Sequence, residues 1–139
     1  MDNEIAGYEL LAGTPDVETY RRLRRISGLS EKSLEAATRG LPNTLFAVTI
    51  VSNGEKVGMG RIIGDGGCFY QITDIAVDPA HQGKGLGKMI MKALVDHLRE
   101  TAPKSAYVSL IADGPAKHLY EKFGFKATAP VSIGMALQL

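Results

Sequence analysis

The stretch from residue 75 to residue 88 constrains the fold of this chain more than any other. It begins with the apolar run Ile75-Ala76-Val77, which ends at Asp78-Pro79, and three alternating glycines then precede a long amphipathic segment. Glycines at a junction between a strand and a helix remove the Cβ atoms that would keep a ligand away from the backbone. The first N–H groups of the helix lie at the positive end of its dipole, so this junction is suited to binding phosphate.

The spacing of the glycines separates three kinds of phosphate-binding loop. A Walker loop that ends in Gly87-Lys88 needs glycine and a hydroxyl where this chain has Gln82 and Met89. The dinucleotide fingerprint G-x-G-x-x-G places Lys88 where its third glycine belongs. The pattern that fits the chain is Gln82-x-x-Gly85-x-Gly87. The alternative is a glycine-rich turn that binds no ligand.

Length and composition indicate one globular domain over residues 1–139, because 45% hydrophobic and 22% charged residues are typical of such domains. The net charge of +1 gives no reason to expect a nucleic acid partner. No apolar run approaches the roughly 20 residues of a membrane span, and the N-terminus lacks a signal-peptide pattern. Cys68 is the only cysteine and the histidines lie far apart, so we expect no disulfide and no metal site. These features predict a cytoplasmic protein.

The first half of the chain is predicted to form a strand, two helices and an antiparallel trio of strands. The strand covers residues 8–11. Thr14 as cap and Pro15 at the first position begin a helix that Gly28 ends, and a second helix runs from Ser30 to residue 41. From residue 44 the period changes to two, which predicts strands at 44–51, 56–63 and 68–77, the first pair joined by an Asn-Gly turn.

The second half is predicted to add a helix, a parallel strand, a helix and a final hairpin. Apolar residues at helical spacing continue from residue 86 to Ala102-Pro103, and residues 107–111 form the next strand. A strand, a crossover helix and another strand imply parallel pairing. A last helix follows over residues 113–122, and strands at 125–128 and 131–139 complete the order βααβββαβαββ. The predicted class is therefore α+β with a mixed central sheet.

The glycine loop in this element order resembles the coenzyme A pyrophosphate loop of the GNAT acetyltransferase superfamily. The stretch Leu119-Tyr120-Glu121-Lys122-Phe123-Gly124-Phe125 is similar to the Leu-Tyr-x-Lys-x-Gly-Phe sequence that many members carry after the fifth strand. Together the two matches and the element order cover nearly the whole chain, which looks like a small single-domain bacterial member. The resemblance implies the GNAT fold, with fourth and fifth strands that splay apart, and N-acetyltransferase activity.

By this resemblance, acetyl-CoA is the expected cosubstrate. The main chain of Ile75 and Val77 would bind its pantetheine arm as an added strand does, and an N–H near Ile75 or Ala76 would stabilise the thioester oxygen. The pyrophosphate would be held by the N–H groups of the loop and helix start, which are those of Gln82, Gly83, Lys84, Gly85, Leu86, Gly87 and Lys88.

Transfer of an acetyl group requires one proton to leave the amine and one to reach the thiolate. Tyr120 is expected to supply the second, because a phenol near pKa 10 is protonated at neutral pH; packing beside its neighbour is its alternative role. Gln71 and Thr73 lie where relatives often carry a glutamate or histidine base, and neither accepts a proton at neutral pH. Asp74 is the nearest carboxylate, and it could act as the base, position a water molecule or serve a structural role. An unbroken strand directs it to the opposite face, whereas a β-bulge would redirect it.

The acceptor is expected to be a primary amine of a small molecule, an amino acid or a protein. Tyr20, Arg24 and Arg61 are the candidate substrate residues of its binding site, together with Gln71 and Thr73. Two alternatives stay open, which are a donor with another acyl group and a non-catalytic CoA-binding sensor or structural module. Dimers are common among similar proteins, so a homodimer is one expected assembly.

Overall fold

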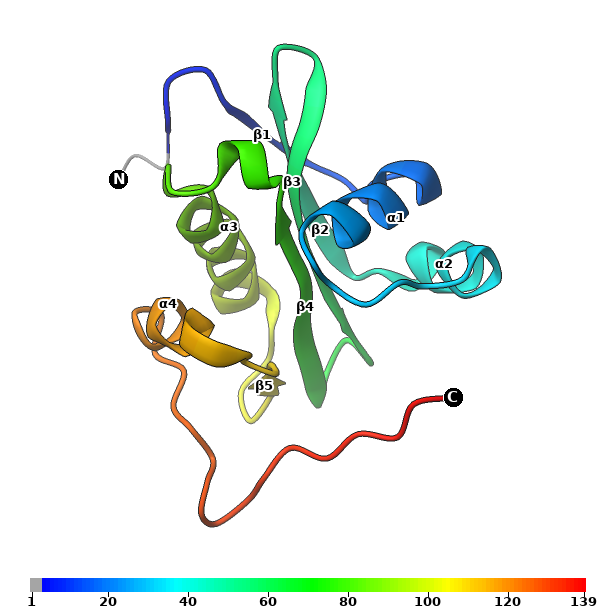
Figure 1. The fold of residues 1–139 in the computed structure, drawn as a ribbon. Coiled ribbons are helices and arrows are strands. Elements are labelled where there is room, and N and C mark those ends of the chain that lie inside the picture. The colour runs from blue at the N-terminus through cyan, green and yellow to red at the C-terminus, as the bar shows by residue number, and fades with distance from the viewer. Residues whose placement is uncertain (1–3) are drawn as a thin grey trace.

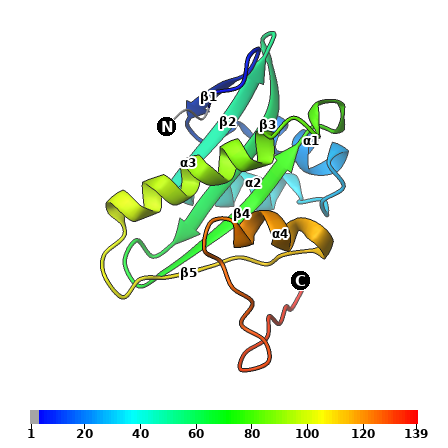
Figure 2. The same ribbon diagram turned by 90° about the vertical axis from the view of Figure 1, so that its left-hand side faces the viewer.

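The structure, a computed structural model, describes residues 4–139 and consists of one sheet between two layers of helices (Figure 1). Helices α1 and α2 cover one face of the sheet, and α3 and α4 lie on the other, as the view turned by 90° also shows (Figure 2). The strands are β1 (Glu9–Ala12), β2 (Phe46–Ser52), β3 (Glu55–Gly64), β4 (Phe69–Val77) and β5 (Tyr107–Ser109). The helices are α1 (Val17–Ile26), α2 (Leu34–Gly40), α3 (Leu86–Thr101) and α4 (Lys117–Glu121).

The strands lie in the sheet in the order in which they occur in the chain. Strands β2 to β4 pair antiparallel and β5 pairs parallel to β4, as the sequence predicted, and β1 adds antiparallel to β2. The parallel pairing covers only Phe69–Gln71 of β4 against Tyr107–Ser109, although β4 continues to Val77. The mixed sheet and the splay of its fourth and fifth strands are therefore confirmed.

Each face of the sheet has its own apolar core. On one face, α3 buries a stripe at helical spacing that includes Leu86, Ile90 and Leu94, each no more than 1% exposed. On the other face, α1 packs Tyr20 and Leu23 against the sheet in a second cluster. The amphipathic helix predicted from residue 86 is thus fixed on the sheet, and it fixes the end of the glycine loop that leads into it. None of the helices within residues 4–139 is both long and apolar enough to cross a bilayer.

The first two helices begin later than predicted. Asp16, rather than Thr14, caps α1, and its Oδ1 accepts a hydrogen bond from the Thr19 amide at 2.7 Å. Ser33, rather than Ser30, caps α2 in the same manner. Ser30 is instead engaged by Arg24, which donates to its carbonyl oxygen at 2.8 Å and to its hydroxyl at 3.0 Å. A contact with the neighbouring helix therefore competes successfully with the local capping signal.

The end of the chain departs furthest from the prediction. Strand β5 ends at Ser109 rather than residue 111, and α4 begins at Lys117 after a short 3-10 turn (Gly114–Ala116). The predicted strands at 125–128 and 131–139 are wrong for the described chain, which follows α4 with an extended tail outside the sheet (Figures 1 and 2). Strand-like alternation alone forms no strand, because a strand requires the hydrogen bonds of a neighbour.

Gly60 lies where β3 crosses beneath α3. A Cβ atom at this position would lie 2.5 Å from Cγ2 of Ile90, 2.8 Å from Cδ1 of Ile75 and 3.0 Å from Cδ1 of Leu94. Such distances are shorter than van der Waals contact, and all three neighbours belong to the packed core around α3. The bare glycine face of β3 is therefore what allows the helix to pack closely against the sheet.

We predict that Gly60→Ala lowers the free energy of unfolding by about 1–3 kcal/mol, because an overpacked core must shift its neighbours. Urea denaturation measures this change. Gly67→Ala is the matched control, since its added Cβ would meet only the Asp65 side chain, at 4.0 Å. We expect the control to stay within about 0.5 kcal/mol of the unsubstituted chain. Equal stability of both variants would contradict the close contact between β3 and α3.

Candidate functional site

A β-bulge in β4 determines where Asp74 points. Arg61 pairs with Thr73 and Met59 pairs with Ala76, so that Asp74 and Ile75 together lie opposite Gly60. Asp74 has a φ of +59°, in the left-handed region that aspartate adopts more readily than most residues. Ile75 packs in the core beneath α3, whereas Asp74 contacts side chains of α1 and β3 on the other face. The bulge considered from the sequence is therefore present and redirects this carboxylate.

The carboxylate of Asp74 is the centre of a buried group of four side chains, called here the Asp74 cluster: Tyr20, Arg24, Arg61 and Asp74. Oδ1 of Asp74 accepts hydrogen bonds from Nη1 of Arg24 at 2.5 Å and from the Tyr20 hydroxyl at 3.0 Å. Oδ2 accepts from Nη1 of Arg61 at 2.7 Å and from the same hydroxyl at 3.1 Å. All four residues are less than 9% exposed, so both carboxylate oxygens are satisfied within the protein.

Both guanidinium groups of the cluster are also engaged on their other nitrogens. Arg24 donates from Nε and Nη2 to Ser30, as described above. Arg61 donates from Nε to the Thr44 hydroxyl at 2.9 Å and from Nη2 to the Gly40 carbonyl at 3.4 Å. The structure thus brings the predicted residues Tyr20, Arg24 and Arg61 together, and their polar atoms bind one another and the backbone.

The hydroxyl of Tyr20 is held in its protonated form. Burial raises its pKa above the ordinary tyrosine value, and the negative charge of Asp74 raises it further. The phenol therefore donates to the carboxylate at neutral pH rather than competing with it as an anion. Its ring lies 5.5 Å from the guanidinium carbon of Arg61, within the range of a cation–π contact.

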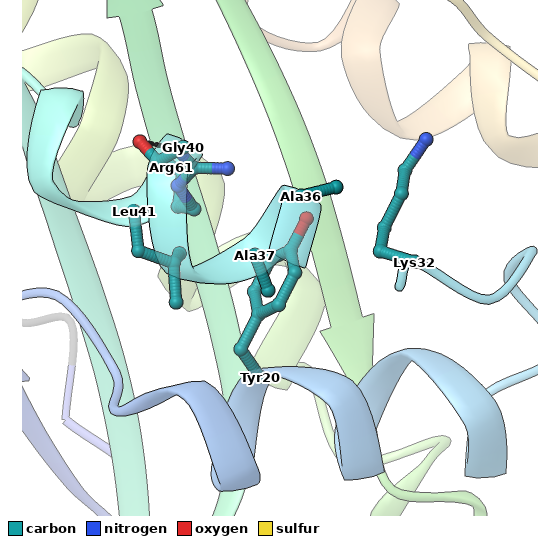
Figure 3. Close-up of a pocket in the computed structure, with 7 residues that line it drawn as sticks. All are labelled: Tyr20, Lys32, Ala36, Ala37, Gly40, Leu41 and Arg61. Atoms are coloured by element: carbon teal, nitrogen blue, oxygen red, sulfur yellow. Dashed lines mark hydrogen bonds between the residues drawn. The ribbon is translucent and has the colours of Figure 1, made fainter. Parts of the chain in front are cut away.

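A small cavity of about 230 Å³ opens beside this cluster, between α1 and α2 (Figure 3). Tyr20 of α1 lines it from below, Arg61 lines it from beside Gly40, and Ala36, Ala37 and Gly40 of α2 contribute the rest of this wall. Lys32 lies at its side (Figure 3). The predicted residues Gln71 and Thr73 are half-buried on β4, where Gln71 is the last residue paired with β5.

The glycine loop lies at the end of β4 and opens into α3. Gly83 and Gly85 have φ values of +78° and +87°, which side chains disfavour, and a Cβ at Gly83 would meet nothing within 4 Å. Gly85 occupies the N-cap position of α3, and no side chain within residues 4–139 caps this helix. The exposed side chains of Lys84 and Lys88 flank the loop. Backbone conformation, open space and positive charge therefore coincide at this junction.

The backbone groups of Val77 face the space that β5 leaves. The amide of the next residue, Asp78, donates to the Val57 carbonyl of β3 at 2.8 Å. Because successive residues of a strand direct their backbone groups to opposite sides, those of Val77 point away from β3. Its carbonyl oxygen accepts a hydrogen bond from Nε2 of Gln82 at 3.0 Å. A ligand that binds this carbonyl must first displace the Gln82 amide.

The loop is also held from the N-terminal segment, a contact that the sequence did not reveal. The hydroxyl of Tyr8 lies 2.8 Å from Nδ1 of His81, and the two rings meet edge to face at 5.6 Å. A Cβ at Gly85 would lie 3.6 Å from Cδ1 of Ile5 in the same segment. No local pattern could indicate this pairing, because Tyr8 and His81 lie 73 residues apart in the chain.

Tyr120 is joined to the glycine loop by the packing of its neighbour. A Cβ at Gly87 would lie 3.5 Å from Cδ2 of Leu119, so α4 packs directly over the first turn of α3. Tyr120 is half-buried, and burial raises its pKa, with a further increase from the charge of Asp113. The two sequence motifs therefore meet in space, and the phenol is protonated at neutral pH.

Comparisons with known proteins agree with this arrangement. A crystal structure of a protein from meticillin-resistant Staphylococcus aureus, described as a probable acetyltransferase of unknown function, has a TM-score of 0.90 and 45% identity and covers 95% of this chain and 99% of its own. An uncharacterized N-acetyltransferase of Pyropia yezoensis is 28% identical over 102 residues, which are 70% of this chain and 58% of that protein. Histone acetyltransferase TAP1 of Glycine max is 34% identical over 126 residues, or 83% of this chain and 54% of that protein.

This chain thus spans little more than half the length of the algal and soybean relatives, and nearly all of the staphylococcal protein. The profile of the acetyltransferase (GNAT) family matches residues 14–125, which include the whole sheet after β1, the glycine loop and Tyr120. The chain therefore belongs to the acetyltransferase (GNAT) family of transferases.

Proposed function

We propose that this chain transfers the acetyl group of acetyl-CoA to a primary amine, which attacks the thioester directly while both substrates are bound. The observation that carries the proposal is the glycine loop, where two left-handed glycines precede an uncapped helix beside splayed strands. Such a helix start binds phosphate through its N–H groups and its dipole. The residues from Gln82 to Lys88 would hold the pyrophosphate, and the Cβ-free space at Gly83 lets it approach the backbone.

The strand splay supports the same ligand. The backbone of Ile75 to Val77 lies beyond the last residue that β5 pairs, so an extended pantetheine arm can add to β4 there. An N–H at Ile75 or Ala76 would stabilise the oxygen of the thioester as charge develops on it. Tyr120 would donate its proton to the departing thiolate, a role supported by its raised pKa and by its contact with the loop through Leu119.

We assign Asp74 the role of a structural anchor rather than that of a base. Both of its oxygens are hydrogen-bonded to the Asp74 cluster, so an incoming amine would have to displace an arginine or Tyr20. Arg24 and Arg61 accordingly position the wall of the acceptor site instead of binding substrate. With this assignment, the amine reacts from its minor unprotonated form or loses its proton through water.

A second candidate is a CoA-binding sensor without catalysis. It is favoured by the engagement of Asp74 and by Gln71 and Thr73, which accept no proton at neutral pH. A longer acyl donor is a further version of the enzyme, because the loop would bind the pyrophosphate and not the acyl group. The cytoplasm is the proposed compartment, since a chain with one cysteine gains nothing from an oxidising environment.

Calorimetric titration with acetyl-CoA, followed by a thiol-release assay on a panel of amines, tests the proposal. The panel contains polyamines, amino acids and peptides with a free N-terminus or lysine, and the donors include acetyl-CoA and longer acyl-CoAs. We expect binding of acetyl-CoA and release of CoA with at least one class of amine. Binding without release on any amine favours the sensor, and no binding heat from folded protein rejects the assignment of the loop.

Tyr120→Phe is expected to reduce the turnover rate by about 10²- to 10⁴-fold, the usual contribution of a general acid, and to leave CoA affinity nearly unchanged. Gly85→Glu should have the opposite effect and abolish CoA binding, because it adds bulk and negative charge at a left-handed position. Steady-state kinetics and calorimetry on both variants separate the two roles. An unchanged turnover rate in Tyr120→Phe would reject this residue as the acid.

Asp74→Asn is expected to lower the free energy of unfolding by about 3–5 kcal/mol, because it leaves two buried guanidinium groups without their counter-charge. Asp96→Asn is the matched control. The side chain of Asp96 is 54% exposed, and its ion pair with Lys92 on α3 contributes about 0–1 kcal/mol. Urea denaturation compares the variants. If Asp74→Asn keeps its stability and loses only turnover, Asp74 is a base and not an anchor.

A further inference from the structure

The last nine residues of the chain carry a strand pattern that the protein leaves uncovered. Apolar side chains recur at every second position, namely Val131, Ile133, Met135, Leu137 and Leu139. A strand with this period places all of them on one face. Their exposed fractions lie between 70% and 115%, so the whole face is open to solvent. A contiguous apolar face of this kind marks an interaction surface.

The outer edge of β5 is the matching feature elsewhere in the fold. Strand β5 is last in the sheet, and within residues 4–139 it pairs only with β4. An open strand edge presents backbone donors and acceptors to any further strand. Large apolar side chains beside this edge are also exposed, with Tyr107 at 51% and Ile111 at 63%. Within residues 4–139, the outer edge of β5 and the segment 131–139 therefore each lack a neighbouring strand.

A groove of about 1,420 Å³ runs along this edge. Residues 107–112 line it as one wall and residues 123–129 after α4 as the other, and Ser132, Ile133 and Gly134 of the chain's own tail also line it. Its apolar floor includes Val95 and Leu98 of α3 and Ala102, the residue that follows this helix. A single strand with one apolar face, placed between the two walls, would cover this floor and could pair with backbone on both sides.

The chain's own tail turns where it meets the groove and does not continue along β5 as a strand. The amide of Ser132 donates to the Thr128 carbonyl at 3.0 Å, and the Thr128 hydroxyl donates to the Ser132 carbonyl at 3.2 Å. This turn precedes the apolar face, and both views show the tail running outside the sheet (Figures 1 and 2). The tail of the same chain therefore touches the groove only through residues 132–134, forms no strand beside β5, and leaves its apolar face exposed.

We propose that residues 131–139 of a second copy of this chain occupy the groove, and that the two copies exchange their tails about a two-fold axis. Each tail adds as a strand beside β5 of the other copy and places its apolar face on the floor formed by α3. Because Tyr120 also lines the groove, the partner's strand completes the surroundings of this side chain. The exchange itself does not depend on the proposed function, since assembly is measured without substrate.

Light scattering after size exclusion tests the assembly on the full chain. We expect a mass of twice the 14.9 kDa of one chain, and a single-chain mass for the double variant Ile133→Asp with Leu137→Asp. Gln138→Glu, a charge on the polar face of the same strand, is the matched control and should remain dimeric. Circular dichroism verifies that all variants are folded. A monomeric unsubstituted chain, or a dimer that survives the double variant, overturns the proposal.

Cross-linking then distinguishes exchange from a hairpin within one chain. In a Cys68→Ser background, one chain carries Ser109→Cys and another carries a cysteine in place of Ile133, Met135 or Leu137, in three separate pairings. Refolding each pair together should give a disulfide between the two different chains for at least one tail position. A disulfide that forms only when both cysteines are in the same chain, and gives a single-chain mass, shows an internal hairpin and rejects the exchange.

Discussion

The arrangement of helices α1 and α2 depends on the hydrogen bonds that the carboxylate of Asp74 accepts. This carboxylate binds Tyr20 and Arg24 from α1 and Arg61 from β3. Through the same two arginines it also fixes Ser30 between the helices, and Gly40 at the end of α2. In this buried group one negative charge faces two positive charges, so its stability rests on complete hydrogen bonding as well as on charge attraction. The wall of the small cavity is thus set by a residue of β4.

The bulge that turns Asp74 inward lies close to the part of β4 where the cofactor is expected to bind. A bulge bends its strand and increases the local twist. Here it falls at Asp74 and Ile75, shortly after Gln71, the last residue that β5 pairs. Strand β4 therefore changes direction near the point where its parallel neighbour ends. The backbone that β5 leaves unpaired and the buried carboxylate therefore lie close together on the same strand.

The sequence predicted what depends on local pattern and missed what depends on distant partners. Period two and the Asn-Gly turn predicted the antiparallel strands, and period 3.6 predicted α3 from its first buried residue, Leu86. The predicted cap of α2 was displaced because Ser30 is bound by Arg24, a contact that no local rule contains. The bulge was considered only as an alternative, since extended pairing gives no signal for one extra residue. The tail has the pattern of a strand, but no strand within residues 4–139 pairs with it.

The glycines of the phosphate-loop motif have different physical roles, although they look alike in the sequence. Gly83 and Gly85 are required for their left-handed conformations, and Gly83 also leaves open space. Gly87 is helical, and a Cβ there would be in ordinary van der Waals contact with Cδ2 of Leu119 at 3.5 Å, so this position marks where α4 packs on the helix start. One part of the motif therefore shapes the loop, while the other lies in the helical turn that contacts α4. The turn that would bind the phosphates is thus the same turn on which α4 packs through Leu119, so the proposed binding site and the proposed acid, Tyr120, belong to neighbouring elements.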